Sequence, residues 1–295
     1  MRRALLILSL LSALALTACG GESGSVEAES DGGGSRQAVL AAAQMTTEAG
    51  SYRSSFDLAF EGLGDEPVSM RGEGVFGSEP PRGRMTFDMS ELGAIAGQDL
   101  GKADFIFDGD TVYMRFPALS SRVPEIKEWI KFDLADLSGQ LGADLGQVSQ
   151  INQSDPSAAL EYLRAASEDV EEVGEEEVRG QPTTRYRMTV DLRKVAAATP
   201  GQRSNVEKVM RLSGIEELPA EVWVDGEGRV RRMTLAYANL KAGQGRETDM
   251  KMTMELFDFG VEVDVEPPEP DRVTDIGDFL GRGAEETEHS EPEGG

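Results

Sequence analysis

Residue types that can do chemistry are few in this sequence, and they limit the reactions it can support. The chain has one cysteine, Cys19, and one histidine, His289. Zinc sites need Cys or His ligands, and nucleophilic devices of the Ser-His-Asp or Cys-His type need a histidine base. His289 stands in an acidic, glycine-containing stretch close to the C-terminus. We therefore expect no metal, no cofactor and no enzymatic activity.

Carboxylates are abundant, with 54 Asp and Glu residues and a formal net charge of −25. Asp108, Asp110, Asp225 and Glu227 are candidates for a calcium site, but they lack EF-hand spacing, and Asp-Gly turns explain them. A glycosidase-like carboxylate pair is a further alternative, although acids more commonly solvate a surface. So acidic a surface repels phosphate backbones, and we expect no nucleic-acid partner.

Cys19 ends an N-terminal segment with a distinct pattern. Arg2 and Arg3 precede an apolar run from Ala4 to Leu16, which is followed by Thr17, Ala18 and Cys19. This is the pattern of a secretory signal peptide, and the run is shorter than the ~20 residues of a transmembrane helix. The residues before Gly20 resemble a bacterial lipobox. The resemblance implies that residues 1–18 are removed and that Cys19 becomes a lipidated N-terminus; the alternative is an ordinary signal peptide with a chance cysteine.

Composition predicts how the remaining chain is organised. Residues 19–35 are rich in Gly, Ser and acids, which is typical of a flexible tether with a root-mean-square reach of roughly 20–24 Å. Residues 36–280 carry the apolar patterns of a folded domain. Residues 281–295 are acidic and are predicted to be a disordered tail.

Within the folded part, apolar residues recur mostly at a spacing of two, which predicts β-strands. Helices are predicted at 35–50, from Asp155 to about residue 167, and at 200–213. The tight turns indicate antiparallel pairing, and so many strands usually curl into a barrel or half-barrel. We expect an α+β fold with a large, highly curved half-barrel sheet and helices on its concave side. About eleven strands are expected, at 51–60, 68–76, 84–89, 105–107, 112–116, 128–133, 168–178, 183–192, 220–224, 230–237 and 248–259.

Residues 134–151 break this pattern, because their apolar residues recur at three or four. Leu137, Leu141 and Leu145 follow this helical spacing, but three glycines interrupt it. Each glycine costs ~1 kcal/mol against Ala in a helix. The segment is either a mobile flap over an entrance or a plain surface helix, and the sequence leaves both open.

Twelve methionines are present, and most occupy alternating strand positions. Flexible methionines suit adaptable binding surfaces, although filling a core is the more common role of any single one. Alternation does not say which face is concave. We expect one apolar face to line a lipid-sized space formed by Phe87, Phe105, Phe107, Met114, Met188, Leu235, Met252 and Met254.

Two motifs carry a resemblance to a known family. Residues 178–186 read VRGQPTTRY, and residues 222–232 read VWVDGEGRVRR. With the lipobox, the tether and the many strands, they resemble the mycobacterial LppX/LprG group of lipoproteins, which share the LolA/LolB-like fold. The resemblance covers most of residues 36–280 and is least clear at 90–151. It implies a half-barrel whose helices enclose an apolar cavity for lipid.

The leading interpretation is a monomeric, non-enzymatic lipoprotein, held on the extracytoplasmic side of the cell membrane by its lipid anchor. It would bind an acylated envelope lipid and transport it. The alternative is an envelope interaction or sensor protein that uses the same fold without a lipid ligand. A cavity would favour the first, and a filled core would favour the second.

Overall fold

The computed structural model describes residues 32–63, 66–95, 97–133, 160, 163, 169–198, 203–242 and 246–277. The chain divides into two units, Met1–Ser30 and Asp31–Gly295, and every described residue belongs to the second. The predicted positions Cys19, Leu137, Leu141, Leu145 and His289 lie outside the described residues.

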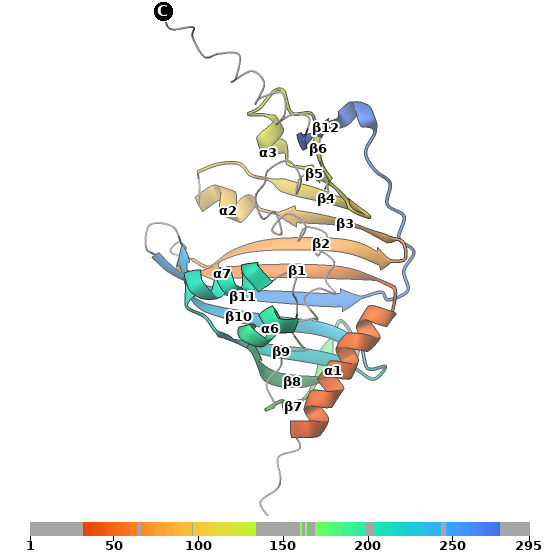
Figure 1. The fold of residues 1–295 in the computed structure, drawn as a ribbon, viewed down its shortest axis with the longest axis vertical. Coiled ribbons are helices and arrows are strands. Elements are labelled where there is room, and N and C mark those ends of the chain that lie inside the picture. Colours follow the sequence, from red (N-terminus) through yellow and green to blue (C-terminus); the bar gives the residue numbers. More distant parts are fainter. Residues whose placement is uncertain are drawn as a thin grey trace, which may run out of the picture. The chain divides into compact units, whose positions relative to one another are not determined.

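The second unit is built on one sheet of twelve strands, in the order β12-β6-β5-β4-β3-β2-β1-β11-β10-β9-β8-β7 (Figure 1). All neighbours are antiparallel except β12 and β6. In the described residues β7 and β12 stay unpaired with each other, so the sheet is open and the predicted α+β half-barrel class is confirmed. The strands are β1 Ser51–Glu61, β2 Val68–Ser78, β3 Pro81–Asp88, β4 Lys102–Asp108, β5 Thr111–Arg115, β6 Trp129–Asp133, β7 Glu171–Val178, β8 Gln181–Asp191, β9 Glu217–Asp225, β10 Val230–Ala242, β11 Arg246–Phe257 and β12 Val273–Asp275.

The strand count exceeds the prediction by one, because β12 is only three residues long and too short to show a period of two. The β7–β8 turn also differs from the prediction. Only Arg179 and Gly180 form it, with φ of 49° and 76°, and Gln181 and Pro182 already belong to β8. Two left-handed residues in succession make a type I′ turn, which matches the twist of the strands it joins.

Helix α1 spans Gly32–Glu48 and begins three residues before the predicted Ser35. Its contacts with β7, β9 and β10 outweigh the low helix propensity of its first glycines. The Thr46 hydroxyl donates to the Ala42 carbonyl at 2.6 Å and accepts the N–H of Val230 at 2.8 Å, which ties the helix to β10.

Four further α-helices are described, and one confirms the prediction at 200–213. None of the helices in the described ranges is long and apolar enough to cross a bilayer. Three of them were not predicted, since four to seven residues are too few to show helical periodicity. The four are α2 Ser90–Ile95, α3 Pro117–Ser120, α6 Leu192–Ala198 and α7 Arg203–Ser213, and a short 3-10 turn, η6, covers Pro270–Arg272.

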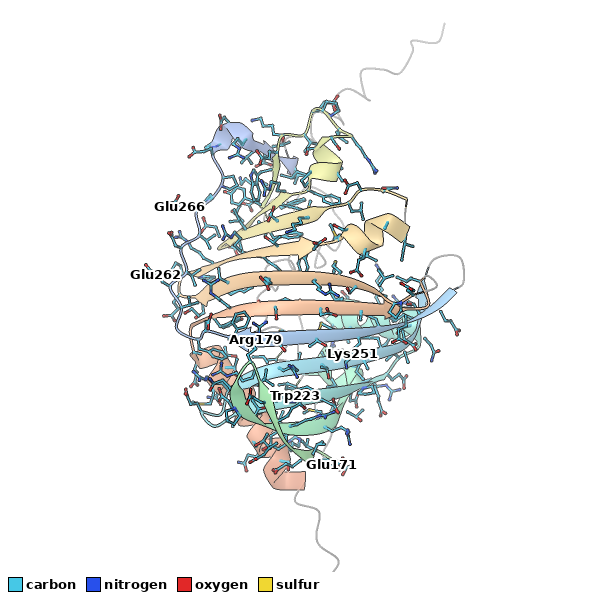
Figure 2. The ribbon with its side chains drawn as sticks, turned by 180° about the vertical axis from the view of Figure 1, so that it is seen from behind. Glu171, Arg179, Trp223, Lys251, Glu262 and Glu266 are labelled. Carbon is cyan, nitrogen blue, oxygen red and sulfur yellow. The ribbon has the colours of Figure 1, made fainter. Side chains whose placement is uncertain are left out.

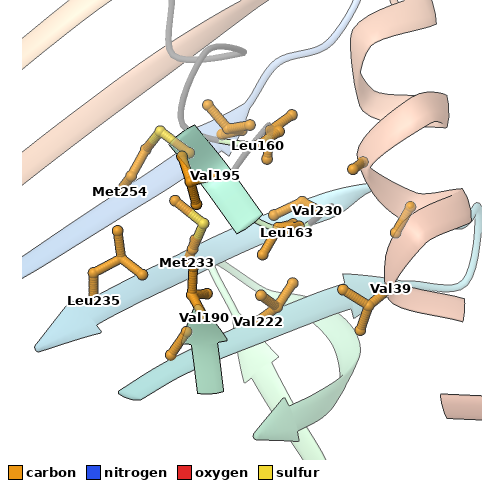
Figure 3. Close-up of a cluster of buried hydrophobic side chains, with 14 of the residues drawn as sticks. Val39, Leu160, Leu163, Val190, Val195, Val222, Val230, Met233, Leu235 and Met254 are labelled. Atoms are coloured by element: carbon orange, nitrogen blue, oxygen red, sulfur yellow. The ribbon is translucent and has the colours of Figure 1, made fainter. Parts of the chain in front are cut away.

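Helices α1, α6 and α7 lie on one side of the sheet, which we call the inner face (Figure 1). They cover the half formed by β7–β11, and their apolar side chains pack with the sheet in one core. Val39 of α1 and Val195 of α6 lie near Val222 and Met233, together with Leu160 and Leu163 (Figure 3).

The opposite, outer face carries a second and smaller core. Residues 258–272, which we call the strap, run from β11 to β12 without joining the sheet. Val263 and Val265 of the strap pack with Val75, Ile106 and Trp129. Glu262, Asp264 and Glu266, which alternate with these valines, are exposed, and Figure 2 labels the first and the last of them. The strap therefore covers one part of the outer face and presents its acids to solvent.

Candidate functional site

All eight predicted cavity residues lie on the inner face. The strand register shows this directly, because Phe105 is opposite Met114, and Leu235 is opposite Met252. Met188 lies on the same face as Leu235, because both are directly opposite Ala220 of β9, one from each side. The structure brings Phe87, Phe107 and Met254 to this face as well, since they alternate with these positions.

The eight residues divide into two groups of four by burial. Phe107, Met188, Leu235 and Met254 are at most 8% exposed and belong to the packed core. Phe87, Phe105, Met114 and Met252 are half-buried. In the first group Met188, Leu235 and Met254 fill space under the helices, and Phe107 packs between the rings of Phe76 and Phe105. The second group lies on the part of the inner face that the described helices leave open.

Other half-buried apolar residues continue this open area across six neighbouring strands. Leu58, Phe60 and Met70 were not predicted, although they alternate in β1 and β2 as the predicted residues do in their own strands. We call the whole set the open apolar face: Phe56, Leu58, Phe60, Met70, Phe87, Phe105, Met114, Met250 and Met252.

Aromatic rings form a connected row on this face. The ring of Phe87 lies 6.4 Å from that of Phe56 and 5.9 Å, edge-on, from that of Phe105, measured between centroids. The rings of Phe105 and Phe107 are stacked with their centroids 6.4 Å apart, and the Phe107 and Phe76 centroids are 6.0 Å apart. These distances are typical of favourable ring pairs. The row links the open apolar face to the packed core.

The inner-face positions of β1–β5, and of residues 248–256 in β11, carry no ionised side chain. Ser54 is a polar but uncharged residue on this face. It is fully buried, and its hydroxyl has no hydrogen-bond partner in the described part of the chain. A surface of this kind can shield hydrocarbon but offers no charge to a polar headgroup.

Charges gather on the outer face instead, where Arg185, Trp223 and Arg232 of the two family-like motifs lie. Arg185 bonds Glu221 at 2.7 Å, and Arg232 bonds Glu255 at 2.7 Å. Both guanidinium groups lie 5.2 Å from the ring centroid of Trp223, which is 4% exposed. Figure 2 shows Trp223 and Arg179 on this face. The arginines and Trp223 of the motifs therefore stabilise strands and turns on the face opposite the open apolar face.

Arg179 illustrates this role. It bonds Glu255 at 2.6 Å, and its guanidinium lies 3.8 Å from the ring centroid of Phe257. Burial alone would raise the pKa of Glu255, but hydrogen bonds from Arg232 and Arg179 outweigh it and lower that pKa. Glu255 is thus held as a carboxylate between two arginines, which is a structural arrangement.

Asp225, a member of the calcium alternative, is fully engaged by the protein. One carboxylate oxygen accepts the backbone N–H groups of Glu227 at 3.0 Å and Arg229 at 2.9 Å. The other accepts Nε of Arg231 at 2.6 Å. Within the described ranges, no group of three or more potential ligands is placed to hold a metal ion. Asp225 therefore closes its Asp-Gly turn.

Asp225→Asn should destabilise the protein by about 1.5–3 kcal/mol at pH 7, since a charged hydrogen-bond acceptor between two arginines is lost. Burial raises the pKa of Asp225, but the Arg229 N–H and the Arg231 and Arg229 side chains outweigh it and lower that pKa. Its stabilisation is therefore present above the unfolded pKa of ~3.9 and is lost as pH falls through the lower folded pKa. Urea unfolding at pH 7 and pH 3 measures this.

The matched control for Asp225→Asn is Glu227→Gln in the same turn, since the Glu227 side chain is 73% exposed and its ion pair with Arg229 should contribute little. The difference in unfolding free energy between wild type and Asp225→Asn should be smaller at pH 3 than at pH 7. A difference that stays the same would contradict this account.

Two pockets lie away from the predicted residues. One of about 570 Å³ is formed at the end of α1 by residues that include Glu48, Ser78, Arg82 and Val261. Another of about 330 Å³ lies beside Arg179 and Phe257. Neither is lined by any of the eight predicted cavity residues, and both have mixed polar walls, so we do not assign the ligand to them.

Comparison with known proteins places this geometry in context. No family model matches the chain. It is 30% identical over 163 residues to an "Uncharacterized 31.2 kDa protein in rplA-rplJ intergenic region" of Streptomyces griseus, covering 53% of this chain and 51% of that protein. It is 27% identical over 157 residues to "Putative lipoprotein SCO4650" of Streptomyces coelicolor, covering 52% of this chain and 44% of that protein. The chain thus spans about half the length of the curated relatives it matches.

Solved structures that match include two mycobacterial lipoproteins. LprF from Mycobacterium bovis covers 80% of this chain and 97% of its own length, with a TM-score of 0.45 and 13% identity. LppX from Mycobacterium tuberculosis covers 78% and 99%, with a TM-score of 0.42 and 16% identity. Both are mycobacterial lipoproteins, the group that the sequence motifs resemble.

Proposed function

We propose that the protein is a lipid-anchored lipoprotein on the extracytoplasmic side of the cell membrane, which binds the acyl chains of an envelope lipid and carries it. The observation that supports this most is the open apolar face. Its half-buried phenylalanines and methionines extend over six strands, and no charged side chain lies among them at the inner-face positions of β1–β5 and residues 248–256. Monomeric soluble proteins rarely leave so continuous an apolar surface without a function for it.

The mechanism is shielding. Each methylene taken out of water contributes ~0.8 kcal/mol, so a surface of this extent stabilises acyl chains that water rejects. Methionines adapt to flexible chains because their side chains are unbranched and have several rotatable bonds. The headgroup would remain off the sheet, since the inner-face positions of β1–β5 and of residues 248–256 offer it no charged partner. No covalent step is required, and the proposed role is non-enzymatic.

Met252→Glu should abolish binding, because a carboxylate placed against acyl chains is costly to desolvate. The matched control is Thr253→Glu, which adds the same charge at the next residue of β11, on the outer face. Native mass spectrometry of the full chain, purified from its own membrane, reports the bound lipid. We expect an acylated lipid on wild type and on Thr253→Glu, and none on Met252→Glu.

Wild-type protein that carries no lipid would contradict the carrier role and favour the alternative, an interaction or sensor protein. Lipid retained by Met252→Glu at the wild-type level would show that the ligand lies elsewhere on the protein.

A further inference from the structure

Strands β2 and β3 contain two reciprocal pairs of phenylalanine and glycine on the inner face. Phe87 of β3 is directly opposite Gly72 of β2, and Phe76 of β2 is directly opposite Gly83 of β3. A Cβ atom on Gly72 would lie 2.6 Å and 2.7 Å from two ring carbons of Phe87. A Cβ atom on Gly83 would lie 2.5 Å from a ring carbon of Phe76. Each ring therefore lies against the glycine backbone.

The backbone does not itself require these glycines. Neither Gly72 nor Gly83 has a positive φ, so any L-residue could adopt either conformation. Glycine inside a strand costs conformational entropy and leaves nothing to pack, and it often marks a close approach by another group. Here the approaching group is a ring, which explains why glycine occupies these positions.

The two pairs differ in their surroundings. Phe76 is 4% exposed in the packed core, and a Cβ on Gly83 would also lie 3.0 Å from the Val75 carbonyl oxygen, so that pair is part of the core. Phe87 is half-buried on the open apolar face.

Gly72 is also opposite Phe56 of β1, so phenylalanines lie on both sides of it. Strands two apart are separated by roughly 9.5 Å. The Phe56 and Phe87 rings are only 6.4 Å apart and therefore lean toward each other above Gly72.

We propose that Gly72 and Phe87 set the depth of the ligand space and so determine which acyl chains fit. Because the Phe87 ring occupies the place of a Cβ on Gly72, it rises less from the sheet than a displaced ring would. A methyl group on Gly72 would push the ring outward over the open apolar face and make the ligand space shallower. This inference rests on the proposed function, and it names the residues that restrict the ligand.

The test uses the full chain and N-phenyl-1-naphthylamine, an uncharged fluorophore that reports apolar binding. Gly72→Ala should raise the Kd of the fluorophore roughly tenfold, which corresponds to about 1.4 kcal/mol. The control is Gly77→Ala, on the same strand but on the outer face, where a Cβ would meet a flexible Val263 methyl at 3.2 Å. Its Kd should stay within about twofold of wild type. Phe87→Leu combined with Gly72→Ala should restore binding, because the displaced ring is gone.

Unchanged affinity in Gly72→Ala, or a loss that Phe87→Leu does not relieve, overturns the inference. Failure of this inference can be distinguished from failure of the proposed function. If wild type binds the fluorophore and responds to Gly72→Ala but never carries native lipid, the carrier role fails and the depth assignment stands. Wild-type protein that does not bind the fluorophore overturns both.

Discussion

Cys19→Ser should release the protein from the membrane, and this is the largest effect that we expect from any single substitution. Cys19 is the only thiol in the chain and stands where a lipobox requires it. A diacylglycerol thioether supplies two acyl chains, and two chains give durable attachment where one gives only marginal binding. The rest of the surface does not replace it, since a net charge of −25 is repelled by anionic headgroups.

The measurement is fractionation of cells, followed by mass spectrometry of the mature N-terminus. Wild type should be in the membrane fraction and begin at a modified Cys19. The serine variant should appear as an unprocessed precursor or as a released soluble form. Ala18→Ser is a suitable control, because it changes the neighbouring residue to another small one and keeps the thiol. If Cys19→Ser matured and fractionated like wild type, Cys19 would not be the anchor.

Tryptophan at two methionine positions should separate the packed half of the inner face from its open half. Met188 is 3% exposed within the core, so Met188→Trp should overpack and destabilise by about 1–3 kcal/mol. Met252 is half-buried on the open apolar face, so Met252→Trp should change stability by less than about 0.5 kcal/mol while displacing acyl chains. Each variant is thus the control for the other.

Urea unfolding and lipid co-purification on the same preparations measure both effects. Displacement of lipid by Met188→Trp without loss of stability would show that space for ligand extends beneath the helices. A large loss of stability in Met252→Trp, with no lipid on wild type, would mean that the face is part of a filled core. That result would favour the interaction protein over the carrier.

Alternation along each strand was enough to place residues on common faces. Side chains of a strand point to opposite sides in turn, so the pattern in the sequence identified Phe105 with Phe107 and Met252 with Met254 as neighbours on one side. Hairpins were similarly readable, because Asp-Gly pairs such as Asp108-Gly109 mark local turns. Cys19 and the segment 134–151, both outside the described residues, remain predictions from the sequence alone.

Strand order and coverage were decided only by the tertiary structure. Strand β1 pairs with β2, which is near in sequence, and with β11, about two hundred residues away, and no local pattern specifies the second partner. That pairing puts Phe56 beside Met254 and joins the two halves of the inner face. Alternation predicts which apolar residues share a side of the sheet, but it does not predict whether a helix packs over them.

Burial shows the consequence of this difference. Met188 and Met252 have the same local pattern, yet Met188 is buried in the core and Met252 is only half-buried at the edge of that core. Gly72 was not predicted from the sequence as a site residue, because its role depends on packing between strands. The two glycines Gly72 and Gly74 in one predicted strand were nevertheless a signal of close approach by another group. The ring that needs Gly72 belongs to the neighbouring strand, and only the register brings it there. Local preference is contained in neighbouring residues, whereas packing depends on contacts between segments that are far apart in the chain.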